Sequence, residues 1–286
     1  MVDPFLPYGH KTYVMGILNI TPDSFSGDGL LSHSQVVESA VEQALRFIEA
    51  GADILDIGGE STRPGAAQIS ATEEQARVLP VIEALAALHL QTLLSVDTYK
   101  AAVAEAALRA GAHWINDVWG LRADPDMPAV AARFRCPVVL MHNRSQAGQV
   151  ILHEHLGGQY LGPHYKDFMA EVKADLLELV RQAEAAGVQP EQIILDPGVG
   201  FGKSVEQNLQ LIDQLDDIKA LGFPVLLGPS RKSFIGMTLN LPAEQRLEGT
   251  AAVCAVGIAR GADILRVHDV ETIVRTACMA DAIVRR

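Results

Sequence analysis

The chain has 286 residues, of which 49% are hydrophobic and 20% charged, as in a soluble globular protein whose core is large enough to fold without disulfides. Lys and Arg total 23 against 35 Asp and Glu, and the resulting net charge of −12 argues against partners such as nucleic acid or an anionic membrane. The 3 cysteines have no CxxC spacing, the first residues do not resemble a signal peptide, and no apolar run reaches the ~18 residues of a membrane span, so we expect a cytoplasmic protein.

Short apolar runs alternate with longer helical patterns along the whole chain. The expected strands cover residues 12–20, 53–59, 92–97, 113–118, 137–142, 192–197, 224–229 and 262–268. The expected helices cover residues 34–50, 72–89, 99–110, 125–135, 166–187, 204–221, 243–260 and 270–285. Apolar strands separated by helices are typical of a parallel sheet that is covered on both faces. Eight such units favour a single α/β domain over residues 1–286, a (β/α)8 TIM barrel, over an open doubly wound sheet, which usually has fewer strands.

Three of the helix-to-strand joints have nearly the same sequence, at residues 49–60, 109–120 and 259–270. In each joint a glycine follows the helix, where a left-handed backbone conformation commonly ends it. We therefore expect Gly51, Gly111 and Gly261 to terminate helices.

Polar or charged residues stand at the ends of almost all the expected strands. They are Asn19, Glu60 to Arg63, Asp97, Asn116 and Asp117, His142 and Asn143, Asp196, Ser230 to Lys232, and Arg266 and His268. In a barrel these ends meet at one mouth, which is where this fold places its active sites. One polar strand end is usually a helix cap or a loop anchor, but a complete set at one mouth indicates a binding site.

Part of this set suits a flat, nitrogen-rich heterocycle. Asp97, Asn116 and Asp196 offer carboxylate and amide groups, and a carboxylate can pair with a ring N–H and a neighbouring amine at once. The glycine-rich segments 21–29 and 58–66 follow the first two strands and are long for βα loops, as expected of lids over such a site.

A second part of the set is cationic, although the protein is acidic overall. Arg63, Lys232, Arg266 and His268 together indicate a phosphate or pyrophosphate ligand. Asn19 offers a neutral oxygen suited to Mg²⁺, which needs few protein ligands when phosphates supply the others.

The segment GVGFGKS at residues 198–204 superficially resembles a phosphate-binding loop. A Walker A motif requires glycine five residues before Gly202, where this chain has Pro197. The segment also lacks the third glycine of GxGxxG, because Lys203 stands in its place. We therefore assign it no nucleotide.

These residues taken together resemble the dihydropteroate synthases, the pterin-binding barrel enzymes of the folate pathway that sulfonamide drugs target. The matching segments follow the family's order and span nearly the whole chain: MGILNITPDSFS (15–26), DIGGESTRPGA (56–66), SVDT (95–98), INDV (115–118), MH (141–142), ILDPGVGFGK (194–203), GPSRKSFIG (228–236) and RVHDV (266–270). The resemblance implies condensation of 6-hydroxymethyl-7,8-dihydropterin pyrophosphate with p-aminobenzoate to give 7,8-dihydropteroate and pyrophosphate.

The resemblance also implies a role for each matching residue. The pterin would be bound by Asp97, Asn116, Asp196 and Lys232, with Val118, Met141 and Phe201 as apolar walls. Pyrophosphate would lie on Asn19 with Mg²⁺, Arg266 and His268, and Arg63 would close over it. The p-aminobenzoate would lie among Thr62, Pro64, Phe201, Lys232 and the backbone N–H of Ser233. The residues expected to act in catalysis are Arg63, Lys232, Arg266 and His268.

The chemistry expected of such a site is cleavage of the C–O bond before attack by the arylamine. An electron-rich ring can stabilise the resulting cation, so the protein must stabilise the leaving charge and exclude water. We expect Asp97 and Asp196 to remain ionised. Two alternatives are a pterin-dependent methyltransferase, which needs no pyrophosphate pocket, and a non-catalytic pterin-binding homologue.

Two further points follow from the comparison with the family pattern. The first loop reads SFSGDG where the family commonly has SFSDGG, so Asp28 is displaced by one position and is assigned no role. The segment 144–165 is likewise assigned none. The resemblance implies a homodimer, for which the apolar helices expected at 243–260 and 270–285 are the candidates.

Overall fold

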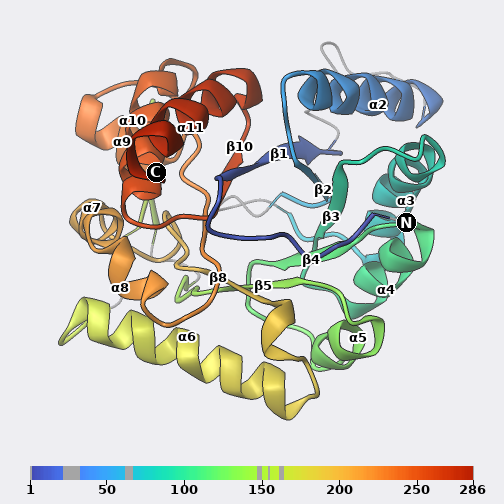
Figure 1. Ribbon diagram of the computed structural model, residues 1–286, viewed down its shortest axis with the longest axis horizontal. Helices are drawn as coiled ribbons and strands as arrows, with labels where there is room; N and C mark the ends of the chain where they lie inside the picture. Colours follow the sequence, from blue (N-terminus) through green and yellow to red (C-terminus); the bar gives the residue numbers. More distant parts are fainter. Residues whose placement is uncertain are drawn as a thin grey trace.

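Eight parallel strands lie in the centre of the molecule and helices surround them (Figure 1). This computed structural model describes residues 2–21, 33–61, 67–146, 150–153, 155–160 and 164–285. The strands are β1 (Tyr13–Asn19), β2 (Ile54–Gly58), β3 (Leu93–Asp97), β4 (Trp114–Asp117), β5 (Val138–Met141), β8 (Ile193–Asp196), β9 (Leu226–Leu227) and β10 (Ile264–Val267). Their order in the sheet is β8-β5-β4-β3-β2-β1-β10-β9.

The two edge strands of this sheet meet, and the sheet therefore closes into a barrel. Leu195 of β8 forms a parallel bridge with Val225 beside β9, and the Leu195 amide donates to the Pro224 carbonyl at 2.9 Å. The (β/α)8 barrel expected from the sequence is confirmed.

The helices are α2 (His33–Glu49), α3 (Ala71–Ala87), α4 (Ala101–Ala110), α5 (Met127–Phe134), α6 (Phe168–Ala185), α7 (Val205–Asp213), α8 (Leu215–Lys219), α9 (Ser233–Leu239), α10 (Leu247–Ala259) and α11 (Val270–Val284). Single turns of 3-10 helix lie at Pro190–Gln192 and Ala243–Gln245. Several helices have the N-terminal caps that their sequences indicate; for example, the Ser204 side chain accepts from the Gln207 amide in a capping box before α7. Gly51, Gly111 and Gly261 have φ of 98°, 116° and 99°, which confirms their expected conformation. Among the described helices, none has the length and apolarity needed to cross a membrane.

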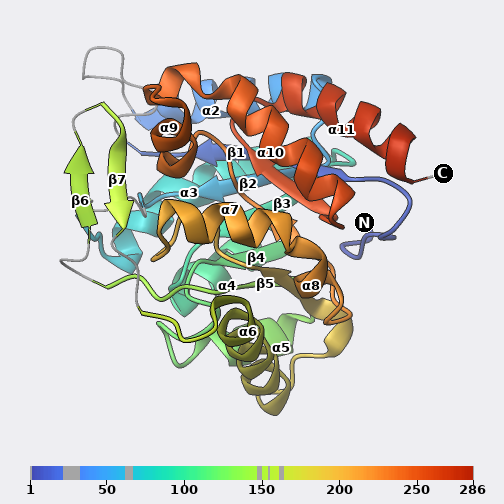
Figure 2. The same ribbon diagram turned by 90° about the vertical axis from the view of Figure 1, so that its left-hand side faces the viewer.

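Three features differ from the sequence-based prediction. The helix expected over 204–221 is two helices, because Gln214 leaves the helical region (φ −107°, ψ 28°) between α7 and α8. A separate helix, α9, follows β9, and the next helix starts at Leu247 rather than at 243. The segment 144–165 contains an antiparallel hairpin of β6 (Val150–His153) and β7 (Gly157–Tyr160), which Figure 2 shows at the end of the barrel opposite the two termini.

The apolar core has two layers, as the alternation of side chains along a barrel strand requires. One layer fills the barrel interior with Met15, Ile54, Leu93, Trp114, Val139, Ile194, Leu226 and Ile264. Val2, Leu6 and Tyr8 of the N-terminal segment pack against this layer. The other layer lies between the strands and the helices and includes Leu18, Leu55, Val96, Ile115, Leu140, Leu195 and Leu265.

Polar residues replace this interior layer nearer the carboxyl ends of the strands. Because side chains alternate, the residues two positions after the apolar interior residues also face inward. These positions include Asp56, Ser95, Asn116, Asp196 and Arg266, and all except Arg266 are buried. The strand alternation therefore builds a polar layer directly on top of the apolar one.

Candidate active site

Arg266 is the centre of the polar layer. It lies on β10 and reaches the carboxylates of two other strands: Nε donates to Asp56 Oδ2 at 2.6 Å, and Nη2 donates to Asp97 Oδ2 at 2.5 Å. Asp56 Oδ2 also accepts from Asn116 Nδ2 at 2.9 Å. One connected network thus joins β2, β3, β4 and β10.

Asp56 is a site residue that the sequence analysis missed. Its side chain is fully buried on β2, and its second oxygen, Oδ1, has no hydrogen-bond partner among the described residues. The sequence analysis considered only the strand ends, whereas Asp56 lies inside the strand. The available signal was the alternation of side chains along the strand, which places Asp56 on the same inward face as Ile54 and Gly58 in an otherwise apolar strand.

Burial changes the charge balance of this network. Burial raises the pKa of Asp97 to about 7, although Arg266 opposes the shift. The expectation that Asp97 stays ionised therefore depends on Arg266, whose guanidinium favours the carboxylate against burial. Burial acts to lower the pKa of Arg266, but the negative charges of Asp56 and Asp97 have a larger effect, and the pKa is raised.

A second group forms around Lys232 and Asp196. The Lys232 ammonium donates to the Val199 carbonyl and lies 4.5 Å from the centroid of the Phe201 ring, a cation–π contact. Burial lowers the pKa of Lys232 to about 8, and Asp196 opposes that shift. Asp196 Oδ1 accepts from the Gly198 amide at 2.7 Å, and burial raises its pKa while Lys232 opposes the change.

The remaining cationic segments lie on the neighbouring strand ends. His268 Nδ1 lies 3.0 Å from Ser230 Oγ, which also accepts from the His268 amide at 3.1 Å. Ser233 is the first residue of α9, and its hydroxyl donates to the Gly158 carbonyl of β7 at 2.6 Å. The β6–β7 hairpin is thereby attached to the segment that carries Lys232.

Arg246, a second residue missed from the sequence, reinforces this attachment. Its guanidinium is buried and donates to the Leu156 carbonyl at 3.1 Å and to the Arg231 carbonyl at 3.0 Å. The hairpin and the Ser230–Lys232 segment therefore share one anchor, although they are far apart in the sequence.

The expected apolar walls and metal ligand also lie at this end of the barrel. Val118 and Met141 are buried at the ends of β4 and β5. Asn19 is half-buried, pairs in register with Gly58, and its side chain makes no hydrogen bond to the parts of the chain that the structure describes. An amide oxygen at this position fits a weakly ligated Mg²⁺ that takes its other ligands from phosphate and water. No cluster of three or more His, Cys, Asp or Glu suited to a metal occurs within the described ranges.

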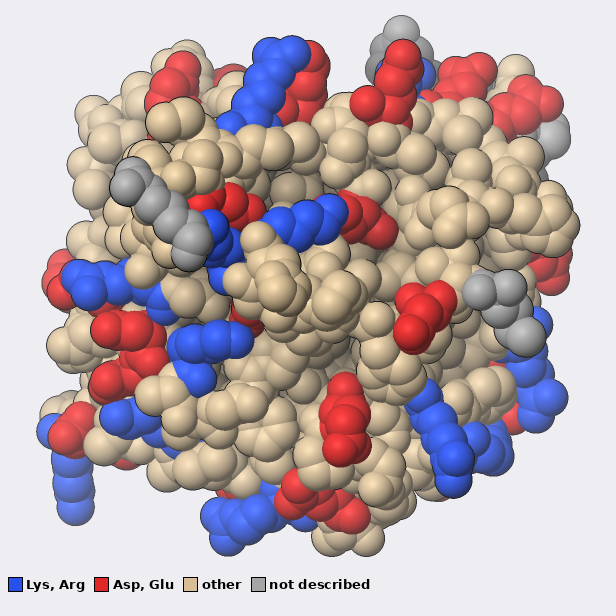
Figure 3. Space-filling model, in the orientation of Figure 1, with Lys and Arg blue, Asp and Glu red and all other residues tan. Residues whose placement is uncertain are grey.

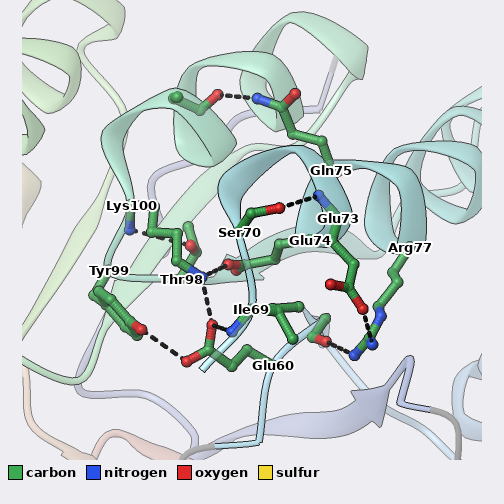
Figure 4. Close-up of polar contacts among 12 residues, drawn as sticks. Glu60, Ile69, Ser70, Glu73, Glu74, Gln75, Arg77, Thr98, Tyr99 and Lys100 are labelled. Carbon is green, nitrogen blue, oxygen red and sulfur yellow. Dashed lines mark hydrogen bonds and ion pairs between the residues drawn. The ribbon is translucent and has the colours of Figure 1, made fainter. Parts of the chain in front are cut away.

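Thr62, Arg63, Pro64 and Asp28 lie outside the described residues, but the base of the second loop is well defined (Figure 4). Glu60, the second residue after β2, accepts from the Tyr99 hydroxyl at 2.7 Å and pairs with the Lys100 ammonium. Glu60 also accepts from the Ile69 amide at 3.5 Å, so this carboxylate links the chain after β2 to the residue just before the N-cap of α3. Lys100 in turn pairs with the buried Glu74 at 2.5 Å.

The described site pairs its cations with carboxylates: Arg266 with Asp56 and Asp97, and Lys232 with Asp196. In Figure 3 basic and acidic side chains are intermingled over the face shown. A cavity of about 580 Å³ lies elsewhere, at the amino-terminal end of the strands, and contains none of the site residues; Leu85, Leu94 and Phe134 are among its walls.

Comparison with known proteins gives a consistent result. The family model for pterin binding enzymes matches residues 15–268. The dihydropteroate synthase of Clostridium beijerinckii is 49% identical, with 97% of this chain and 96% of that protein covered; the enzyme of Bacillus subtilis is 48% identical, with 98% and 92% covered. A crystal structure of the Clostridium difficile enzyme in the presence of pteroic acid has a TM-score of 0.88 at 45% identity, and covers 98% of this chain and 100% of that one. The structure of the Xanthomonas albilineans enzyme in complex with 7,8-dihydropteroate has a TM-score of 0.82 at 43% identity, and the match covers 96% of this chain and 94% of that one.

The chain therefore belongs to the pterin-binding enzyme family, and it shares the overall fold of the Clostridium difficile enzyme. Within that family its relatives are dihydropteroate synthases, and the resemblance found in the sequence is confirmed.

Proposed function

We propose that this chain condenses 6-hydroxymethyl-7,8-dihydropterin pyrophosphate with p-aminobenzoate, giving 7,8-dihydropteroate and pyrophosphate. The observation that carries the proposal is the layer in which Arg266 joins Asp56 and Asp97 while Lys232 lies beside Asp196 and Phe201. It combines acceptors for a nitrogen heterocycle with cations for a departing pyrophosphate. The structures of relatives with pteroic acid and 7,8-dihydropteroate support the same substrates.

The pterin is assigned to the carboxylates and the amide. Asp97, Asn116 and Asp196 come from three strands, face the barrel axis and can pair with ring N–H and amine groups. Lys232 adds a donor for a ring acceptor. Val118, Met141 and Phe201 supply the apolar surfaces against which a flat ring packs, as apolar lining is usual in small-molecule sites.

The pyrophosphate is assigned to Arg266, His268 and Asn19, with Arg63 from the second loop. Arg266 keeps its charge over the whole physiological range because two carboxylates stabilise it. Mg²⁺ bound through Asn19 would neutralise part of the pyrophosphate charge when it is present.

The p-aminobenzoate is assigned to Thr62, Pro64, Phe201, Lys232 and the backbone N–H of Ser233. Lys232 donates to the Val199 carbonyl and makes a cation–π contact with Phe201. Its ammonium therefore has a fixed position from which to contact the carboxylate or the ring of the substrate. In this position the amine of the substrate would approach the pterin methylene carbon.

The proposed reaction begins with cleavage of the C–O bond to pyrophosphate. The bonding electrons leave with the pyrophosphate oxygen, and the pterin ring delocalises the positive charge on the methylene carbon. The amine nitrogen of p-aminobenzoate then forms the C–N bond and releases one proton. The protein's contribution is to stabilise the leaving anion with Arg266, His268 and Arg63 and to keep water from the cation.

We also propose that the chain forms a homodimer through α10 and α11. The two helices pack side by side, and each exposes large apolar side chains: Val256 (46%) on α10, and Met279 (64%) and Ile283 (54%) on α11. We expect these side chains to attract a partner. Met279→Glu should convert a dimer to a monomer in analytical ultracentrifugation, and a wild-type chain that sediments as a monomer would refute the proposal.

The proposed cytoplasmic location is supported by the cysteines. Cys136, Cys254 and Cys278 are all free thiols, as is usual in a reducing compartment. Cell fractionation tests this assignment, and recovery of the protein only from an extracytoplasmic fraction would contradict it.

Formation of dihydropteroate from the two purified substrates tests the activity. The account predicts that product appears only when both substrates and Mg²⁺ are present. Pterin binding without product would instead identify a non-catalytic homologue.

A further inference from the structure

Lys203 is a buried amine that the proposed reaction does not use; burial lowers its pKa to about 7, and Asp196 opposes that shift. Only 2% of the residue is exposed, and it follows the glycine-rich segment that superficially resembles a phosphate loop. The side chain folds back under its own loop: Nζ lies 2.9 Å from the Gly198 carbonyl oxygen and 3.1 Å from the Phe201 carbonyl oxygen. The loop is therefore wrapped around a cation of the protein itself.

His142 at the end of β5 completes the surroundings of this ammonium. Its Nδ1 lies 2.9 Å from Lys203 Nζ, and its Nε2 lies 3.1 Å from Asp175 Oδ2 on α6. Burial lowers the His142 pKa to about 4, and the positive charge of Lys203 adds to the shift, so the ring is neutral. It accepts from Lys203 at Nδ1 and donates from Nε2 to Asp175, which Arg144 Nε also contacts at 2.6 Å. All three ammonium hydrogens of Lys203 thus have acceptors.

The other side of the same loop faces the active site. The Val199 carbonyl, between the two peptide units that Lys203 binds, accepts from the Lys232 ammonium. A Cβ on Gly200 would lie 2.6 Å from Lys232 Cδ, and one on Gly198 would lie 1.9 Å from the His142 carbonyl oxygen. Gly198 and Gly200 have φ of 70° and 78°. The loop can therefore pass closely between the two lysines only in this conformation.

We propose that Lys203 is a positioning residue, which fixes the loop 198–202 and through it the placement of Phe201 and Lys232 toward p-aminobenzoate. The proposal rests on the assignment of that substrate to Phe201 and Lys232 above. Lys203 does not touch substrate in this account; it holds the carbonyl groups of Gly198 and Phe201, which lie on either side of the Val199 carbonyl that contacts Lys232.

Lys203→Met tests the proposal, because methionine retains a similar apolar stem and removes the ammonium. With the carbonyl groups released, the KM for p-aminobenzoate should rise about tenfold or more, since small misplacements of positioning groups have effects of that size. The dissociation constant for the dihydropterin should rise by a smaller factor. Asp196, Lys232 and Phe201 belong to this loop or contact it, but Asp97 and Asn116 are bound by Arg266 and Asp56 instead.

Gln192→Met is the matched control. Gln192 is equally buried and its side-chain amide also binds two backbone carbonyls, those of Ala131 and Cys136, but at the amino-terminal end of β8. It should lose thermal stability and keep the wild-type KM. In hydrogen exchange, the Phe201 amide, which donates to Gly198, should exchange faster in Lys203→Met, whereas the Leu195 amide should not.

The outcomes separate this inference from the proposed function. A Lys203→Met enzyme that is less stable but has a wild-type KM would overturn the positioning role, and so would an equal rise of KM in Gln192→Met. If Lys203→Met does not fold, Asp175→Asn replaces it: weakening the outer support of His142 should raise the same KM, and no change would overturn the proposal. If Lys232→Ala alone leaves the kinetics intact, the substrate assignment has failed instead.

Discussion

Asp56→Asn is the substitution that tests the polar layer most sharply. The change keeps the shape of the side chain and removes its charge. In the wild-type chain one oxygen of Asp56 accepts from Arg266 at 2.6 Å and from Asn116 at 2.9 Å. An amide oxygen in the same place can still accept from both donors, with its NH₂ group at the position of Oδ1, but it lacks the negative charge that pairs with Arg266.

The expected cost follows from the charge that is lost. A hydrogen bond to a charged group contributes about 1.5–3 kcal/mol. Asp97 still pairs with Arg266, so we expect a loss of about 2 kcal/mol, which is about 30-fold in the dissociation constant of the pterin substrate. The reason is that Arg266 and Asn116 must be held in place before the ligand arrives.

Isothermal titration with the dihydropterin measures this effect directly, and Asp263→Asn is the control. Asp263 is also fully buried and accepts from a cation (Lys219, 2.6 Å) and from a second donor (the Val225 amide, 2.8 Å), and its Oδ1 has no hydrogen-bond partner within the described ranges. Unlike Asp56, it lies at the start of β10. Asp263→Asn should lower stability without affecting pterin affinity. The reasoning is refuted if Asp56→Asn binds the pterin like the wild type, or if both variants lose affinity equally.

Three further outcomes are expected. Lys232→Ala and Arg63→Ala should each lower kcat/KM by about tenfold or more in a steady-state assay, since each removes a cation from the site; unchanged rates would be incompatible with these assignments. Burial places the pKa of Asp97 at about 7 and that of Lys232 at about 8. The Asp97 carboxylate is therefore lost as the pH falls below about 7, and the Lys232 ammonium is lost as the pH rises above about 8. The pH profile of kcat/KM should have its maximum between these values, and Asp97→Asn should remove its acidic limb. Chelation of Mg²⁺ with EDTA should stop turnover but leave the binding of a pterin without pyrophosphate unchanged, and full activity in EDTA would contradict the metal assignment.

The barrel and most of the site could be predicted because both depend on local alternation. Apolar strands bounded by glycine and polar residues identify the strands. The polar residue at each strand end identifies the mouth, and Asp97, Asn116, Asp196 and Arg266 all lie there in the structure. No long-range information was needed for these positions.

The elements that could not be predicted depend on contacts between distant segments. The β6–β7 hairpin has a sequence with little apolar alternation, and contacts far along the chain anchor it: Ser233 to Gly158, and Arg246 to Leu156. Asp56 was missed because it lies inside a strand, where only the alternation of side chains shows that an acidic residue faces the barrel interior. The role of Lys203 was out of reach because a sequence does not show that a side chain folds back beneath its own loop.

The central claim is that this site removes pyrophosphate from a dihydropterin and transfers the pterin to an arylamine. The most direct test measures pyrophosphate release from the dihydropterin pyrophosphate with Mg²⁺, in the presence and absence of p-aminobenzoate. The account predicts release that is accompanied, when p-aminobenzoate is present, by an equal amount of 7,8-dihydropteroate. Tight pterin binding with no release of pyrophosphate under either condition would contradict it.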